Sequence, residues 1–493
     1  MSEELMRLRI AKAQEEIESK KEQVKIAKMR QHYHLMPQCG WMNDPNGLIY
    51  FKGKYHVFYQ TNPYCGFWDC MHWGHAVSED LLHWEYLPLA LAPSESYDDY
   101  QKGGCFSGSA IVRDGKLFLF YTGTAHHGQG NVQSQCLAVS EDGVTFQKYE
   151  GNPVVTAPEG IGADLFRDPK VWEHEGKYYM VVGASRSQRG LALLFRSEDL
   201  YHWEYMNVLA ESRGEWGFMW ECPDFFPLGD KYVLTFSPMG SGDHSSVYLT
   251  GEFDYRTGKF DAHVSGEMDW GFDYYAPQSM LAPDGRRLIF TWANEWEWMP
   301  IFKDWGPTYR EGWCGFLNLI REARLREDGT LQFLPIKEME AIREKASRQE
   351  ELTICEPQPL CAGDGISFEL RFVLDLEKTD AEQVELCLRC GEGKQTAFVI
   401  DLKRGELSVD RSRSDGWSKG VSRSVLMLKG KKELDVHIFS DQSSLEIFTD
   451  QYSNNHSNNI FAGDAQKELS ICAHGGRAVL RDFESYGLKE CFR

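Results

Sequence analysis

The chain has 493 residues, of which 74 are acidic and 53 basic, giving a formal net charge of −21. Such a negative chain is a poor match for nucleic acid or an anionic membrane surface, because both require basic patches on a protein. The length is sufficient for two substantial hydrophobic cores. We therefore expect more than one domain, and neither nucleic acid nor membrane as a partner.

Residues 1–31 are expected to form a helical extension. Ile10, Ile17 and Val24 recur at heptad spacing, and Lys20 interrupts the apolar stripe that they define. Such a stripe can pair with a second subunit, giving a homo-oligomer, or dock on the protein's own surface. Both alternatives stay open at this point.

The sequence predicts a cytoplasmic protein without a cofactor. It shows no charged-then-apolar signal peptide and no apolar run long enough to span a bilayer. The 13 cysteines are an odd number scattered over both halves, whereas a secreted disulfide framework would pair them. Histidines and carboxylates do not show the spacing of a metal site, so we expect no metal and no cofactor.

A strand pattern recurs along residues 32–335. In each copy a glycine turn with a basic residue precedes an aromatic and apolar strand; the turns lie at Gly53, Gly115, Gly176, Gly229 and Gly285. The copies are 53 to 62 residues apart and contain short alternating strands without long helical patterns, which is typical of four-stranded blades. Five copies predict an all-β fold, a five-bladed β-propeller.

Three acidic residues open three of these repeats. They are Asp44 before Pro45, Asp168 before Pro169, and Glu221 in Glu221-Cys222-Pro223. A single Asp-Pro pair is explained by a turn, but three acids in register are not. Equivalent positions of repeated units meet when the units pack around an axis. The three carboxylates are therefore predicted to share one pocket, and paired carboxylates are the chemistry of glycoside hydrolysis.

The motif set resembles glycoside hydrolase family 32, the family of invertases, fructanases and sucrose-6-phosphate hydrolases. The resemblance covers residues 32–493 and rests on the segments 41–47, 58–60, 106–109, 167–169 and 221–223, which occur in the family's order. It implies that Asp44 is the nucleophile and Glu221 the general acid/base. It also implies that Asp168 holds sugar hydroxyls and stabilises the transition state.

The implied reaction is hydrolysis of β-fructofuranosidic bonds in sucrose, sucrose 6-phosphate or short fructooligosaccharides. Breaking a ketosyl bond builds oxocarbenium character, so one ionised carboxylate must face the anomeric carbon while a protonated one faces the leaving oxygen. Two carboxyls about 5 Å apart give retention through a covalent fructosyl-enzyme on Asp44. The alternatives are a fructosyltransferase or fructan hydrolase of the same family, an inverting arabinanase-like glycosidase, and a non-catalytic carbohydrate-binding propeller.

Aromatic and amide side chains near the blade openings are expected to shape the sugar pocket, because sugars offer apolar faces as well as hydroxyls. The predicted substrate-binding residues are Trp41, Asn43, Gln60, Trp68, Phe106, Ser107, Arg167 and Asp273. Arg167 is expected to help keep Asp168 ionised. Tyr274 and Trp292 are expected to belong to the core. Arg186 and Arg189 are either phosphate ligands or solvent-exposed loop charges.

The character of the chain changes after about residue 330. Residues 336–352 are predicted to form a linker or a short charged helix. Beyond them, segments such as 366–374 and 434–439 alternate between apolar and polar residues. Period-two patterns bounded by turns favour a β-sandwich, which we assign to residues 353–493.

Overall fold

The structure, a computed structural model, describes residues 2–99, 103–126, 130–242, 244–299 and 306–492. These residues divide into two compact units. Unit 1 contains the described residues of 1–27, 36–267 and 275–331, and unit 2 those of 28–35, 268–274 and 332–493. Most of the described chain is β-structure, as predicted.

The N-terminal helix α1 (Ser2–Lys25) docks on unit 1 itself. Its buried side chains are Met6, Ala13, Ile17 and Val24, and the helix contacts β4 (Trp84–Leu91). Met6 belongs to the hydrophobic core formed by the first two sheets. Of the two roles open for the apolar stripe, docking on the protein's own surface is therefore the observed one. None of the described helices is both long and apolar enough to cross a bilayer.

In the described part of unit 1 the strands form five sheets, which are antiparallel apart from one short parallel strand in the first. The first contains β1 (Gly40–Phe51), β2 (Lys54–Asn62), β3 (His72–Ser78) and β4, with the short β19 (Trp313–Cys314) paired parallel to β1. The second contains β5 (Gly104–Arg113), β6 (Lys116–His126), β7 (Asn131–Ser140) and β8 (Gln147–Lys148). The third contains β9 (Phe166–His174), β10 (Lys177–Arg186), β11 (Arg189–Ser197) and β12 (Trp203–Glu211).

The last two sheets follow the same plan. The fourth contains β13 (Met219–Leu228), β14 (Lys231–Met239), β15 (Val247–Asp254) and β16 (Lys259–Glu267). The fifth contains β17 (Tyr275–Leu281), β18 (Arg287–Trp292), β20 (Arg321–Leu325) and β21 (Leu331–Pro335), with the short helix α2 (Gly306–Arg310) between β18 and β19.

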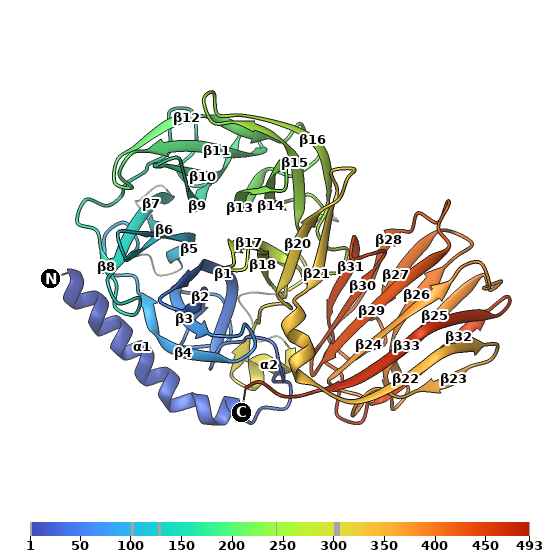
Figure 1. Cartoon of the computed structure of the whole chain (residues 1–493). Helices are drawn as coiled ribbons and strands as arrows, with labels where there is room; N and C mark the ends of the chain where they lie inside the picture. Colours follow the sequence, from blue (N-terminus) through green and yellow to red (C-terminus); the bar gives the residue numbers. More distant parts are fainter. Residues whose placement is uncertain (1, 100–102, 127–129, 243, 300–305, 493) are drawn as a thin grey trace. The chain divides into compact units, whose positions relative to one another are not determined.

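The first strands of the five sheets contact one another in order: β1 with β5, β5 with β9, β9 with β13, β13 with β17, and β17 with β1. Figure 1 shows these strands around the centre of unit 1, with the other strands of each sheet outside them. Hydrophobic clusters between neighbouring sheets supply the core. This arrangement is consistent with a propeller, and it places the start of every sheet at the centre.

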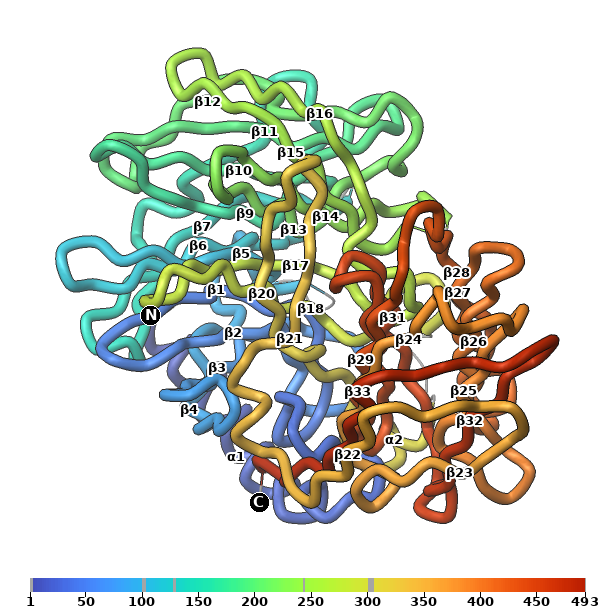
Figure 2. The backbone as a smooth tube through the Cα atoms, turned by 45° about the vertical axis from the view of Figure 1, so that its right-hand side comes forward, coloured from blue at the N-terminus to red at the C-terminus, as the bar shows by residue number. Residues whose placement is uncertain are grey.

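Unit 2 contains two six-stranded sheets within its described residues (Figure 2). One has the order β22 (Arg343–Ile354), β33 (Ala478–Leu488), β24 (Phe368–Asp375), β29 (Glu433–Asp441), β30 (Ser444–Thr449) and β31 (Asn454–Asn459). The other has the order β23 (Gln358–Leu360), β32 (Glu468–His474), β25 (Gln383–Gly391), β26 (Lys394–Asp401), β27 (Glu406–Asp410) and β28 (Val421–Val425). A shared apolar core lies between them, consistent with a sandwich.

The segment expected to be a linker, 336–352, has regular structure. A 3-10 helix, η1 (Lys337–Ile342), is followed directly by β22, which pairs along its length with β33. Most side chains of β22 are exposed, so the segment shows no strong apolar alternation. This strand forms through backbone pairing at the edge of a sheet. The composition of the segment did not predict a strand, because it shows no apolar alternation.

Candidate active site

The first strand of each sheet in unit 1 is interrupted at the same place by a register shift. The interrupting residues are Asn43 and Asp44 in β1, Ser107 in β5, Asp168 and Pro169 in β9, Cys222 and Pro223 in β13, and Ala276 and Pro277 in β17. Such bulges re-aim side chains. The backbone of Asp168, Cys222 and Ala276 has φ of 68°, 48° and 54°, a left-handed conformation that costs of order 1–3 kcal/mol at a non-glycine residue.

Aligning the strands on these bulges corrects the predicted register of the acids. Asp44 and Asp168 each directly precede a proline, and the residue at that position of β13 is Cys222. Glu221 stands one residue earlier, at the position that Arg167 occupies in β9. The acids therefore do not share one register, although all three reach the same cavity, because the bulge turns two successive residues toward it.

The cavity has a volume of about 370 Å³. Its described lining residues are Asn43, Asp44, Gln60, Trp68, Phe106, Ser107, Asn131, Gln133, Asp164, Leu165, Arg167, Asp168, Glu221, Met239 and Trp296. The three predicted catalytic acids and six of the eight predicted binding residues are in this set. Two aromatic walls, Trp68 and Phe106, meet edge to face with ring centres 5.8 Å apart. The size and the mixture of aromatic and polar groups suit a sugar.

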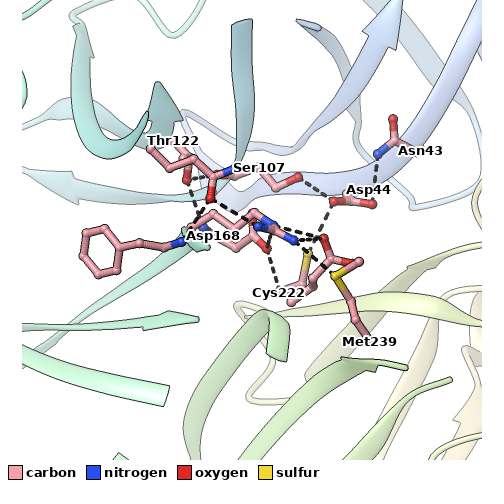
Figure 3. Close-up of polar contacts among 12 residues, drawn as sticks. Asn43, Asp44, Ser107, Thr122, Asp168, Cys222 and Met239 are labelled. Carbon is pink, nitrogen blue, oxygen red and sulfur yellow. Dashed lines mark hydrogen bonds and ion pairs between the residues drawn. The ribbon is translucent and has the colours of Figure 1, made fainter. Parts of the chain in front are cut away.

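Asp44 is held on the bulge of β1 by three neighbours (Figure 3). Ser107 Oγ donates to its Oδ2 at 2.6 Å and Asn43 Nδ2 to its Oδ1 at 3.0 Å, while the Cys222 thiol lies 3.4 Å from Oδ2. Burial raises the pKa of Asp44, and the charge of Glu221 raises it further against the hydrogen bond from Ser107. The hydrogen bonds fix the direction in which the carboxylate faces the cavity.

The pKa of the buried Asp168 carboxyl is strongly raised. Burial raises the pKa of Asp168 to about 7; the charge of Arg167 opposes the rise, and the carboxylates of Glu221 and Asp44 add to it. The backbone N–H of Cys222 donates to Oδ2 at 2.9 Å (Figure 3). Burial beside two negative neighbours makes full ionisation of this group costly.

Both oxygens of Glu221 are occupied by donors. Arg167 donates to Oε1 through Nη2 at 2.8 Å and Nε at 3.0 Å, and the Tyr275 hydroxyl donates to Oε2 at 2.6 Å. Arg167 Nε lies 4.0 Å from Asp168 Oδ2, so its main partner is Glu221 and not the acid that the sequence suggested. The pair fixes the orientation of Glu221 at the cavity wall.

Two predicted binding residues do not line the cavity. Trp41 is fully buried and contacts a lining residue instead: its Nε1 donates to Asn43 Oδ1 at 2.7 Å. Asp273, the other one, is a buried carboxylate of unit 2, where it accepts hydrogen bonds from Arg411 Nη1 and the Asn459 N–H, both at 2.6 Å. In the sequence, the acid of a buried ion pair cannot be distinguished from an acid of a binding site, because both occur beside aromatic residues.

Two aromatic residues were expected in the core, and two arginines were expected to be phosphate ligands or exposed loop charges. Tyr274 and Trp292 are fully buried, as expected for core. Arg186 pairs with Glu211 at 3.0 Å, and the Arg186 side chain is 42% exposed. Arg186 and Arg189 lie opposite each other at the β10–β11 turn, and neither is among the described lining residues of the cavity. The structure agrees with their interpretation as exposed loop charges.

Sequence reasoning missed Tyr275, although a signal for it exists. In Tyr275-Ala276-Pro277 the tyrosine stands two residues before the proline, as Glu221 and Arg167 do in their strands. Gln133 was also missed; its Oε1 accepts a hydrogen bond from Arg167 Nη1 at 3.2 Å. Gln133 lies on β7, outside the bulges, and only tertiary packing brings it to the cavity.

Comparison with known proteins identifies the family. The N-terminal domain of glycosyl hydrolases family 32 matches residues 34–335, and the family's C-terminal domain matches residues 338–487. A sucrose-6-phosphate hydrolase of Zymomonas mobilis is 38% identical over 486 residues, covering 93% of this chain and 92% of its own. A raffinose invertase of Escherichia coli is 39% identical over 470 residues, covering 91% of this chain and 93% of its own.

Solved structures show the same relationship. A Bombyx mori beta-fructofuranosidase of family 32 superposes with a TM-score of 0.82 at 34% identity, covering 98% of both chains, and a mutant of it has been solved in complex with sucrose. A sucrose-6-phosphate hydrolase of Lactobacillus gasseri shares the fold, with a TM-score of 0.86 at 24% identity over 97% of this chain and 96% of its own. The resemblance carried by the motifs is confirmed: the chain belongs to glycosyl hydrolase family 32 and is a glycoside hydrolase.

Proposed function

We propose that the protein is a retaining β-fructofuranosidase. The observation that carries this proposal is the single cavity of unit 1, into which Asp44, Asp168 and Glu221 all project. A non-catalytic sugar-binding propeller would not need three carboxylates in one cavity, because their mutual repulsion costs stability. The names of the relatives, a sucrose-6-phosphate hydrolase, a raffinose invertase and a beta-fructofuranosidase, agree with the proposal.

The reaction begins with attack of the Asp44 carboxylate on the anomeric carbon of the fructosyl group. Glu221 gives its proton to the leaving oxygen, and a covalent fructosyl-enzyme forms on Asp44. Glu221 then takes a proton from water, which releases fructose with its configuration retained. Asp168 binds sugar hydroxyls and faces the developing positive charge. Arg167 and Tyr275 hold Glu221 at the leaving oxygen.

The proposed substrates are sucrose, sucrose 6-phosphate and short fructooligosaccharides. Among the described lining residues of the cavity, four are carboxylates and Arg167 is the cation, already engaged with Glu221. This charge pattern favours the uncharged sugars over a phosphorylated one. We expect kcat/KM for sucrose to equal or exceed that for sucrose 6-phosphate when both are assayed side by side. A phosphate preference of tenfold or more, about 1.4 kcal/mol, contradicts this ranking.

The ring of contacts among β1, β5, β9, β13 and β17 supports a closed five-bladed propeller. We propose residues 32–335 as the propeller domain and 353–493 as the sandwich domain, with 1–31 as a helical extension and 336–352 joining the two domains. We also propose a cytoplasmic enzyme that takes small sugars. A homo-oligomer remains part of the proposal and is tested by analytical ultracentrifugation.

The test separates the two catalytic acids with an activated substrate. Asp44→Ala removes the nucleophile, so it abolishes turnover of both sucrose and fructosyl fluoride. Glu221→Ala removes the proton donor, so sucrose cleavage collapses while fructosyl fluoride, whose leaving group needs little protonation, still reacts. The intermediate then accumulates and is detected on Asp44 by intact-protein mass spectrometry.

The matched control is Glu198→Gln, an exposed carboxylate paired with Lys177. This variant keeps wild-type rates on both substrates. Loss of fructosyl fluoride turnover in Glu221→Ala, with no adduct on Asp44, rules out the assigned roles. A ligand-bound crystal structure with the two carboxyls about 6.5–9.5 Å apart, in place of about 5 Å, indicates an inverting enzyme such as an arabinanase-like glycosidase.

A further inference from the structure

Lysine side chains of α1 reach a loop of the first sheet. Lys20, the residue that interrupts the apolar stripe of the helix, donates through Nζ to the backbone carbonyl of Tyr64 at 2.7 Å. Lys12 Nζ lies over the Tyr64 ring, 5.8 Å from its centre. Two cations of one helix, eight residues apart, thus contact the same residue. We call residues 63–71, which connect β2 to β3, the Trp68 loop.

The Trp68 loop carries one of the aromatic side chains that line the cavity. Trp68 itself lines the cavity four residues after Tyr64. Asn62 braces the loop from inside, since its Oδ1 accepts from the Tyr64 N–H at 3.1 Å and its Nδ2 donates to the Phe67 carbonyl at 3.0 Å. The ring of Phe67 stacks on Tyr309, 6.2 Å between centres. A shift of Tyr64 is therefore transmitted over a short, braced segment to the Trp68 side chain.

The end of the Trp68 loop is tied to the strand that carries the second wall. The Met71 N–H donates to the Gly103 carbonyl at 2.7 Å, and the Cys105 N–H donates to the Met71 carbonyl at 3.0 Å. Phe106 follows on β5. Arg9 of α1 secures the connection that precedes β5 by donating to the Pro93 carbonyl at 2.6 Å. The helix thus contacts both segments that lead to the aromatic walls.

We propose that α1 is a positioning element for the sugar cavity, in which Lys20 fixes the Trp68 loop through the Tyr64 carbonyl and so sets the affinity for substrate. The inference rests on the proposed function only for the nature of that substrate. Loops are mobile unless tied down, and ordering an aromatic wall when the sugar binds costs affinity. Because Lys20 is not among the described residues that line the cavity, its effect is expected on binding and not on the chemical steps.

The test compares Lys20→Met with Lys21→Met. Met keeps the apolar stem and the helix propensity of Lys while removing the ammonium. Lys21 pairs with Glu18 on the same helix, so its variant controls for loss of a helix charge. We expect Lys20→Met to raise KM for sucrose about fivefold with kcat within about twofold, and Lys21→Met to change neither. Lys20→Arg, which restores a cationic donor, rescues KM.

Two further readouts separate positioning from general stabilisation. In a Trp68→Ala background, Lys20→Met no longer changes KM, because the wall that it positions is gone. Hydrogen exchange of the amides of residues 64–68 is about tenfold faster in Lys20→Met than in wild type, in the protein without sugar. An unchanged KM and unchanged exchange overturn the proposal, as does a parallel fall of kcat and melting temperature.

The exchange experiment also distinguishes the two proposals. If the wild-type protein does not cleave fructosides, the proposed function fails, while exchange at residues 64–68 still decides whether Lys20 fixes the loop. If the wild type cleaves sucrose and Lys20→Met behaves as Lys21→Met does, the function stands and the positioning role of α1 is refuted.

Discussion

Buried carboxylates in the two units have pKa values shifted in opposite directions. In unit 1, Asp168 is buried beside two other carboxylates, and the nearest nitrogen of Arg167 is 4.0 Å away. In unit 2, Asp441 is buried against His34, whose Nδ1 lies 2.7 Å from Oδ2. Burial raises the pKa of Asp168 to about 7, whereas hydrogen bonds from His34 and the His32 N–H outweigh burial and lower the pKa of Asp441 to about 2.

The difference shows which buried acids are available for chemistry. Asp441 is neutralised by a fixed cation, and Asp273 is neutralised in the same way by Arg411. Such pairs hold segments together and have no open face. The charge of Asp168, next to a cavity, is not fully balanced by a cation. This imbalance costs stability and keeps the group available to interact with a substrate. Burial alone therefore does not mark a catalytic acid.

The largest expected effect is on activity, in Asp168→Asn. The amide keeps the shape of the side chain but removes its charge, so kcat/KM for sucrose falls by about three orders of magnitude. The same variant is more stable than wild type above pH 7. The pKa of Asp168 is raised, so its destabilising contribution is absent below the unfolded value of 3.8 and complete above about 7.

Fructoside assays and urea unfolding at pH 4 and pH 8 measure both effects. The stability gain of Asp168→Asn should be present at pH 8 and absent at pH 4. An Asp168→Asn variant that is inactive and also less stable at pH 8 would show that the cavity acid is a structural group like Asp441.

The second effect is on stability, in Asp441→Asn. This variant leaves the buried imidazolium of His34 with one carboxylate fewer, and we expect a loss of about 3 kcal/mol of unfolding free energy. Activity of the folded protein stays within about twofold of wild type, because neither residue lines the cavity. Urea unfolding and initial rates at low temperature provide the measurements. A large fall in kcat/KM without destabilisation contradicts the comparison.

The third effect is the pH dependence of unit 2. Burial lowers the pKa of His34, but hydrogen bonds to Asp441 and Glu446 outweigh it and raise the pKa to about 9. The stabilisation from His34 is therefore fully present below its unfolded pKa of 6.5 and is lost as the pH rises through 9. The contribution of Asp441 is present above 3.8 and is lost as the pH falls through about 2.

Hydrogen exchange of residues 28–35 measures this dependence. Protection should fall between pH 6.5 and 9 after correction for intrinsic rates. His34→Gln removes that fall, whereas His83→Gln, at an exposed histidine paired with Asp80, retains it. A wild-type profile that is flat over this range excludes a charged His34.

The smallest effect is expected in Tyr275→Phe. Loss of the hydroxyl frees Glu221 Oε2 from one of its donors, so kcat for sucrose falls about tenfold, or roughly 1.4 kcal/mol. Turnover of fructosyl fluoride falls less, because protonation of the leaving group matters less there. Tyr205→Phe, at a partly exposed tyrosine, is the control. An equal loss on both substrates assigns Tyr275 to a step other than proton transfer.

Much of the cavity could be predicted from short motifs. The acids and the Asn43, Gln60, Trp68 and Ser107 side chains lie near the sheet openings, and the repeats bring those openings together at the centre of unit 1. Asp273 precedes β17 closely in the sequence but lies in a stretch that belongs to unit 2, and it is not among the described lining residues of the cavity. Local sequence does not reveal to which core a short connecting segment contributes.

The sequence by itself determined where the strands and turns form and where a proline follows Asp44, Asp168 and Cys222. It could do so because apolar alternation, glycine turns and proline act over only a few residues. Tertiary structure decided which partner each charge received. Arg167 turns to Glu221, and Lys20 of α1 reaches the Tyr64 carbonyl. These contacts join residues far apart in the chain, and their strength depends on burial and distance, neither of which is written in local sequence.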